Sequence, residues 1–247
     1  MFTTIPIESQ WLWAFSVNAI LIAIAQRLPL LTRSGWVHAG ALGTILLGCL
    51  GWSGWLSVVV YLLLGSLVTR LGFARKQEKG LAEARGGRRG PENLWGSAAT
   101  GAFLAILVAA ELGSKTLLIV GFAASFAAKL ADTFGSEIGK RWGKRAVLIT
   151  SLRNVPAGTD GAISLEGTFA SVLGSLIMTT AIVGLFYMDI GPFGAVIFFS
   201  GFFATLFESL LGAVVQQRLN WLTNEMVNGL QTSFAAVFAM VIVSRLI

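Results

Sequence analysis

The chain has little charge, little cysteine and little histidine. Charged residues make up 12% of its 247 residues, and Cys49 and His38 are the single residues of their kinds. A disulfide within the chain is therefore excluded, and a zinc site of cysteine and histidine is not expected. Nucleic-acid binding is not expected either, because no basic domain lies outside the apolar segments. The first ten residues lack Lys and Arg, so we expect a retained first span and no cleaved signal.

Apolar residues are abundant instead, at 55% of the chain, and the mean hydropathy is +0.76. Both values are high for a soluble domain. The apolar segments lie near 10–26, 36–51, 54–72, 95–111, 115–135, 164–186, 192–213 and 224–246. The second is short and the last is polar in its first half. We predict an all-α polytopic membrane protein with seven or eight transmembrane helices, forming one integral membrane domain over residues 1–247. The 29 glycines indicate close helix packing.

Positive charges fall in every second connection between these segments. Basic residues follow the first, third, fifth and seventh segments, and Lys115 is the one clear exception. By the positive-inside rule, the basic connections are cytoplasmic and the N-terminus lies on the far side. We therefore expect two long cytoplasmic loops, near 73–94 and 140–163.

A polar stripe closes the fifth apolar segment. On a helix, Lys129, Asp132, Ser136 and Lys140 would share one face. A carboxylate at membrane depth is costly and usually has a function. Asp132 and Glu137 are separated by about 140° around a helix, so they can hold one ion only if a helix end lies between them. The alternative is a structural ion pair between Lys129 and Asp132.

A glycine-rich segment, 158–168, leads into the sixth apolar segment. Its small residues, including Thr159, Ser164 and Thr168, would present N–H groups at the start of a helix, which suits an anion. Glu166 would oppose an anion there unless a cation bridges the two. The alternative is an ordinary helix start, with Ser164 as the N-cap and Glu166 in the first turn.

Further polar residues stand in the other segments. Arg88 and Arg89 lie among glycines, where guanidinium and backbone N–H groups can converge on phosphate, although attraction to lipid headgroups is an alternative. Glu208 lies within the seventh apolar segment, and Asn224 and Asn228 begin the eighth, where helix–helix hydrogen bonding would also explain the amides. Carboxylates and cations together fit phosphoryl transfer, and they also fit transport of an anionic lipid headgroup.

These motifs resemble the membrane-integral phytyl-phosphate kinase family, the tocopherol-pathway enzymes of chloroplasts and cyanobacteria. The resemblance covers most of the chain after about residue 65, and more distantly it extends to polyprenol and phytol kinases. Its most specific parts are 132–144 and 155–168, with further matches at 87–91, 208–213 and 221–228. The N-terminal spans match mainly in hydropathy.

The resemblance implies transfer of a phosphoryl group from a nucleoside triphosphate, CTP or another, to an isoprenyl monophosphate such as phytyl phosphate. The diphosphate formed would serve tocopherol or isoprenoid-quinone synthesis. We expect Mg²⁺ as cofactor and membrane lipids as neighbours, and a homo-oligomer is left open. The absence of a plastid-type transit peptide favours a bacterial protein, of cyanobacterial type, in the inner or thylakoid membrane with its active site facing the cytoplasm.

We expect Asp132, Glu137 and Glu166 to be catalytic, and Asp132, Glu166 and Glu208 to bind Mg²⁺. The residues expected to bind substrate or phosphate are Arg88, Arg89, Lys129, Ser136, Lys140, Lys144, Thr159, Ser164, Thr168, Asn224 and Asn228. The main alternative is a transporter or flippase for a phosphorylated isoprenoid lipid, whose carboxylates would bind a coupling cation. A third alternative, a membrane assembly factor, leaves the carboxylates unexplained.

Overall fold

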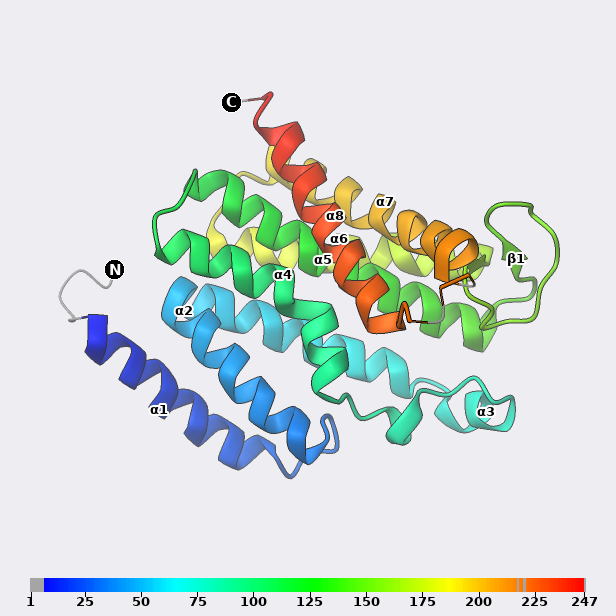
Figure 1. Cartoon of the computed structure of the whole chain (residues 1–247), viewed down its shortest axis with the longest axis horizontal. Coiled ribbons are helices and arrows are strands. Elements are labelled where there is room, and N and C mark those ends of the chain that lie inside the picture. The colour runs from blue at the N-terminus through cyan, green and yellow to red at the C-terminus, as the bar shows by residue number, and fades with distance from the viewer. Residues whose placement is uncertain (1–6, 217, 220, 247) are drawn as a thin grey trace.

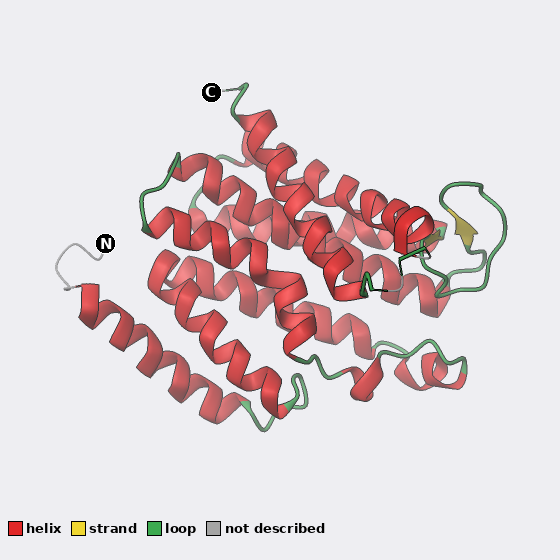
Figure 2. Ribbon diagram, viewed as in Figure 1, coloured by secondary structure: helices red, strands yellow, loops and turns green. Residues whose placement is uncertain are grey.

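The computed structural model describes residues 7–216, 218–219 and 221–246, most of which are helical (Figures 1 and 2). The long helices are α1 (Ile7–Ala25), α2 (Arg33–Arg70), α4 (Pro91–Ala109), α5 (Lys115–Trp142), α6 (Leu165–Phe186), α7 (Ala195–Leu211) and α8 (Asn224–Val243). The short elements are α3 (Phe73–Glu78), the 3-10 turn η1 (Ala84–Gly87), the π-helical turns η2 (Ile190–Gly194) and η3 (Gly212–Gln216), and the strands β1 (Val147–Leu148) and β2 (Ala162–Ile163). The all-α prediction is confirmed.

Six of the described helices are long and apolar enough to cross a membrane. One of them, α2, has 38 residues and would be about 57 Å long if it were straight, nearly twice the apolar thickness of a bilayer. It does not run straight, because Gly51 has φ 63°, a conformation that glycine adopts without strain. The chain doubles back at this point (Figure 1), which corresponds to the predicted segments 36–51 and 54–72.

The central helix of the bundle is α5, which packs against α2, α4, α6, α7 and α8. Every residue from 120 to 131 is buried. At the crossing with α6, a Cβ added to Gly167 would lie 2.8 Å from the carbonyl oxygen of Gly135, and one added to Gly174 would lie 2.8 Å from that of Leu130. Glycines therefore let the two backbones approach closely, as their position within apolar segments predicted.

The two long connections lie at one end of the bundle, and the described chain ends lie toward the other (Figure 1). Side-chain caps start two of the helices that lead out of the connecting end. The Ser164 hydroxyl accepts the Gly167 N–H at 3.1 Å, and the Thr223 hydroxyl accepts the Met226 N–H at 3.3 Å. The basic residues of the two long connections therefore lie at one end of the bundle, while the side of the membrane that this end faces stays a prediction.

The end of α5 differs from the predicted segment 115–135. The helix continues through Gly135 and Gly139 to Trp142, since neither glycine breaks its hydrogen bonding. No helix end therefore separates Asp132 from Glu137, and the two carboxylates face different directions. The following connection also contains a feature that hydropathy did not predict, an antiparallel pairing of β1 with β2.

Candidate active site

A polar pocket of about 400 Å³ lies at the end of the bundle that carries the long connections. Helices α2, α4, α5, α6, α7 and α8 line it together with residues of the two connections. Five cations and six carboxylates contribute to this lining, in a chain that is only 12% charged. Such a volume is typical of small-molecule sites. The concentration of charge marks the pocket as the candidate active site.

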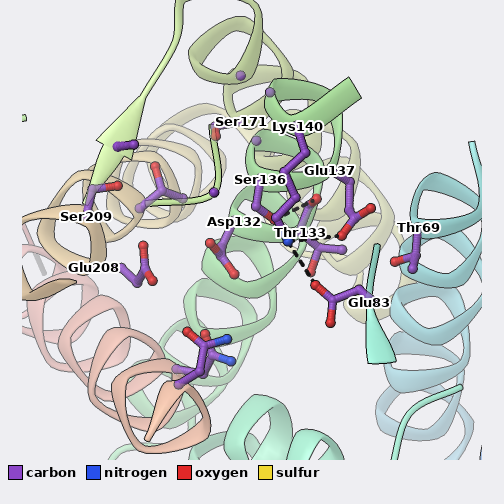
Figure 3. Close-up of a pocket in the computed structure, with 18 of the residues that line it drawn as sticks. Thr69, Glu83, Asp132, Thr133, Ser136, Glu137, Lys140, Ser171, Glu208 and Ser209 are labelled. Carbon is purple, nitrogen blue, oxygen red and sulfur yellow. Dashed lines mark hydrogen bonds and ion pairs between the residues drawn. The ribbon is translucent and has the colours of Figure 1, made fainter. Parts of the chain in front are cut away.

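The polar stripe of α5 forms the floor of the pocket. The Lys129 ammonium lies 2.5 Å from the Asp132 carboxylate and 2.9 Å from the Asn228 amide oxygen on α8. The Lys129–Asp132 pair is therefore real, but both residues also open into the pocket. Figure 3 shows the carboxylates of Asp132 and Glu208 facing one another across it. An ion between them would contact oxygen atoms from both α5 and α7.

Glu137 points to another wall, where α3 is anchored. The Lys76 ammonium of α3 pairs with the Glu137 carboxylate and also donates to the Thr69 carbonyl oxygen at 2.7 Å. The Lys76 and Glu137 side chains are only 1% and 3% exposed. Lys140 lies 3.7 Å from the other Glu137 oxygen. The geometry therefore gives Glu137 a structural partner, Lys76. Nothing in the sequence distinguished Lys76 from the other basic residues of the first long connection.

Lys140 connects the α5 stripe to the first long connection. Its ammonium lies 3.0 Å from the Glu83 carboxylate (Figure 3). Burial acts to raise the pKa of Glu83, but the Lys140 ammonium and its hydrogen bond outweigh burial, so this pKa lies below its ordinary value. Glu83 is therefore ionised at neutral pH, and its ion pair with Lys140 holds the first long connection over the pocket.

Arg89 forms part of another wall of the pocket. Its guanidinium donates to the Tyr61 hydroxyl and lies 4.8 Å above the centre of the Tyr61 ring. The Tyr61 hydroxyl in turn lies 3.1 Å from the Ser97 hydroxyl of α4. Sequence reasoning missed Tyr61 and Ser97, because a single tyrosine or serine within an apolar segment carries no signal of its own.

The second connection covers the pocket from the side of α7. Gly161 has φ 77° and packs so tightly that a Cβ there would lie 2.6 Å from the Ser209 carbonyl oxygen. Only glycine permits this approach. The contact fixes the neighbouring Thr159 at the pocket wall.

Thirteen of the fifteen predicted site residues line the pocket, and two do not. Those that do are Arg88, Arg89, Lys129, Asp132, Ser136, Glu137, Lys140, Thr159, Ser164, Thr168, Glu208, Asn224 and Asn228. Outside the lining, the Glu166 carboxylate accepts the Lys144 backbone N–H at 3.3 Å. Helix capping, the alternative considered above, therefore accounts for Ser164 and for Glu166 in the first turn of α6.

The donor set at the floor of the pocket fits Mg²⁺. This ion is usually held by one or two carboxylates together with substrate phosphates and water. Asp132 and Glu208 supply such a pair of carboxylates. Over residues 7–216, 218–219 and 221–246, no cluster of three or more His, Cys, Asp or Glu could hold a metal by protein ligands alone. A divalent cation would thus complete its coordination with phosphate oxygens and water.

Comparison with known proteins adds three relatives and one family. The model of a family described as integral membrane protein DUF92 matches residues 16–236. "Uncharacterized membrane protein sll0875" of Synechocystis is 45% identical over 235 residues, covering 93% of this chain and 90% of that protein. "Protein VTE6, chloroplastic" of Arabidopsis thaliana is 37% identical over 238 residues, covering 93% and 71%. "Uncharacterized membrane protein MJ0933" of Methanocaldococcus jannaschii is 31% identical over 229 residues, covering 92% and 91%. No solved structure matches.

Proposed function

Since the chain belongs to the DUF92 family of integral membrane proteins, we propose that its pocket acts on a membrane lipid phosphate. The reaction is transfer of the terminal phosphoryl group of a nucleoside triphosphate to an isoprenyl monophosphate, with phytyl phosphate as the first candidate. The observation that carries this proposal is the pocket itself, in which cations and paired carboxylates meet where apolar helices end. The motif resemblance to phytyl-phosphate kinases and the 37% identity to a chloroplast protein support it.

This phosphoryl transfer requires that the two substrates be positioned, but it does not require a general base. The second pKa of a phosphate monoester is about 6, so its oxygen is already ionised at neutral pH. That oxygen attacks the terminal phosphorus, the bond to the bridging oxygen breaks, and a nucleoside diphosphate leaves. Catalysis then rests on alignment and on neutralisation of charge. Glu137, held in its pair with Lys76, is not needed as a base.

We assign roles by position in the pocket. Arg88 and Lys140 lie where nucleotide phosphates would enter from water, and Thr159 on the second connection would bind them from the opposite side. Asp132 and Glu208 would hold Mg²⁺, which, when bound, neutralises phosphate charge.

The direct test is product formation. The purified protein in detergent is given phytyl monophosphate, Mg²⁺ and each nucleoside triphosphate in turn, and the lipid diphosphate is measured by mass spectrometry. We expect one or more nucleotides to be consumed in equal amounts with the lipid. If no nucleotide is consumed with phytyl, geranylgeranyl or shorter substrates while reconstituted vesicles move the lipid phosphate across the bilayer, the protein is a transporter and the proposal is wrong.

Variants test the carboxylates separately. Asp132→Asn and Glu208→Gln preserve volume but remove the charge that faces the pocket, so we expect kcat to fall by about a thousandfold. Glu166→Gln and Glu111→Gln are the matched controls, because neither residue lines the pocket. Both should keep kcat within about threefold of the parent protein. If a folded Asp132→Asn protein turns over at the normal rate, the reaction centre does not lie at the part of the pocket formed by α5.

A further inference from the structure

Among the residues that the structure describes, Arg89 is a half-buried cation of the pocket with no carboxylate within ion-pair distance. The other partly shielded cations, Lys129 and Lys140, each pair with a carboxylate, and so does the exposed Arg85. Arg88 also lacks such a pair, but it is exposed to water. A guanidinium that is withdrawn from water without a counter-ion is costly. Among the described residues of the pocket, the Arg89 guanidinium is therefore the shielded cation whose counter-ion would have to come from a ligand.

Arg89 is held in place by backbone contacts as well as by its side chain. Its N–H donates to the Leu30 carbonyl at 3.1 Å, and its carbonyl accepts the Thr32 N–H at 3.0 Å, so the segment before α2 holds it on both sides. On α2, a Cβ added to Gly65 would lie 2.5 Å from Arg89 Nη2. The guanidinium thus occupies the space that a side chain at position 65 would fill. A charge fixed in this way is preorganised for a ligand.

The neighbours of Arg89 are a chain of hydrogen-bonded hydroxyl groups and one further cation. The Tyr61 hydroxyl accepts from the guanidinium and donates to the Ser97 hydroxyl, and Lys129 lines the same pocket. These groups come from α2, α4 and α5 and converge on one wall of the pocket. A guanidinium and an ammonium on one wall together suit a phosphate monoester that carries nearly two negative charges.

The position of this wall indicates which phosphate it takes. Lys129 lies thirteen residues before α5 ends at Trp142, which is about 20 Å of helix, so it is far from the water-facing end. The Tyr61 ring packs against Phe126 of the apolar core, with ring centres 6.0 Å apart. A lipid headgroup reaches such a depth from within the bilayer, while the triphosphate meets Arg88, Lys140 and the connections first.

Resting on the function proposed above, we propose that Arg89, Tyr61 and Lys129 form the subsite for the monophosphate of the lipid acceptor, separate from the nucleotide subsite. Arg89 supplies the guanidinium that binds the phosphate oxygens. Tyr61 accepts a hydrogen bond from that guanidinium and so positions it. The subsite thereby distinguishes a lipid phosphate from the corresponding lipid alcohol.

Binding measurements without turnover test this assignment. Purified protein in detergent is titrated with phytyl monophosphate, with phytol, and with ATP and CTP analogues that carry a methylene group between the last two phosphorus atoms. Arg89→Gln should weaken phytyl monophosphate binding ten- to a hundredfold, the usual effect of losing a hydrogen bond to a charged group. Phytol and nucleotide binding should change less than threefold.

Two milder variants and one control sharpen the result. Gly65→Ala keeps the charge but takes the space of the guanidinium, and Tyr61→Phe removes only the hydroxyl. Both should reduce the preference for phytyl monophosphate over phytol. Arg75→Gln removes the same charge from the same connection outside the pocket and should change nothing.

The outcomes separate the two proposals. An unchanged phosphate preference in Arg89→Gln, or in Tyr61→Phe if Arg89→Gln does not fold, would overturn the subsite. A selective loss of nucleotide binding would assign Arg89 to the triphosphate instead. Arg89-dependent binding of phytyl monophosphate in a protein that consumes no nucleotide would leave the subsite in place and refute the kinase. If the protein consumes nucleotide equally well with and without the Arg89 side chain, the kinase proposal stands and the subsite is refuted.

Discussion

The buried pair between Lys76 and Glu137 allows an asymmetric prediction about stability. Removing one member of a buried ion pair commonly costs about 3–5 kcal/mol, because the other charge is left without compensation. Here the two members are not equivalent. Without Lys76, the Glu137 carboxylate still has Lys140 at 3.7 Å, whereas without the Glu137 charge the Lys76 ammonium keeps only the Thr69 carbonyl. We therefore expect Glu137→Gln to cost about 3–5 kcal/mol and Lys76→Met about 1–3 kcal/mol.

A double-mutant cycle completes the test. Lys76→Met combined with Glu137→Met removes both charges, and apolar side chains of similar volume then fill the site, so most of the lost stability should return. Unfolding would be followed by tryptophan fluorescence in mixed micelles of increasing SDS content. Arg75→Met, on the exposed face of α3, is the control. Additive costs in the double variant, or a larger cost for Lys76→Met than for Glu137→Gln, would refute this account of how α3 is anchored.

Three further outcomes follow from the structure. Gly167→Ala should lower the thermal midpoint because its Cβ would press on the α5 backbone, whereas Gly184→Ala on the same helix meets nothing within 4 Å and should leave it unchanged in a melting curve. Lys79→Cys and Ala157→Cys, both exposed, should react with a membrane-impermeant maleimide only from the cytoplasmic side, and labelling from outside would contradict the orientation. Because the folded-state pKa of Glu83 is lowered, its charge contributes stability at neutral pH that is lost as the pH falls below 4.5 through that pKa; Glu83→Gln should flatten this acid limb in melting curves.

The features that could be predicted from the sequence are those that repeat with the helical period. Apolar runs gave the helices, and the i+3 and i+4 spacing from Lys129 to Lys140 placed four side chains in one pocket. Such patterns need no knowledge of the neighbouring helices. The same spacing argument showed that Asp132 and Glu137 face different directions, and the continuous α5 bears this geometry out.

The features that could not be predicted depend on which helices meet. Tyr61 and Ser97 acquire their role only because α2 and α4 bring them to Arg89, and Lys76 only because α3 folds back onto α5. Glu166 shows the opposite case. Its neighbour Gly167 faces α5, and successive residues of a helix point about 100° apart, so the Glu166 carboxylate turns away from the pocket. A sequence motif defines the spacing of residues along the helix, but it does not define how the helix is rotated about its axis relative to the pocket.

The charge balance of the pocket connects the cation and the phosphates. The lining holds five cations and six carboxylates, and the partners Lys76 and Glu92 that lie outside it leave the balance at one negative charge. A triphosphate would meet net repulsion from such a pocket. A divalent cation between Asp132 and Glu208 would change the balance to one positive charge, and the two carboxylates would then hold the cation that holds the phosphate. Binding of the cation and of phosphate should therefore strengthen each other by the same factor, because coupling between two ligands is reciprocal. Because carboxylates are in excess at the lipid boundary, we expect the pocket to bind phosphate tightly only when the metal ion is bound.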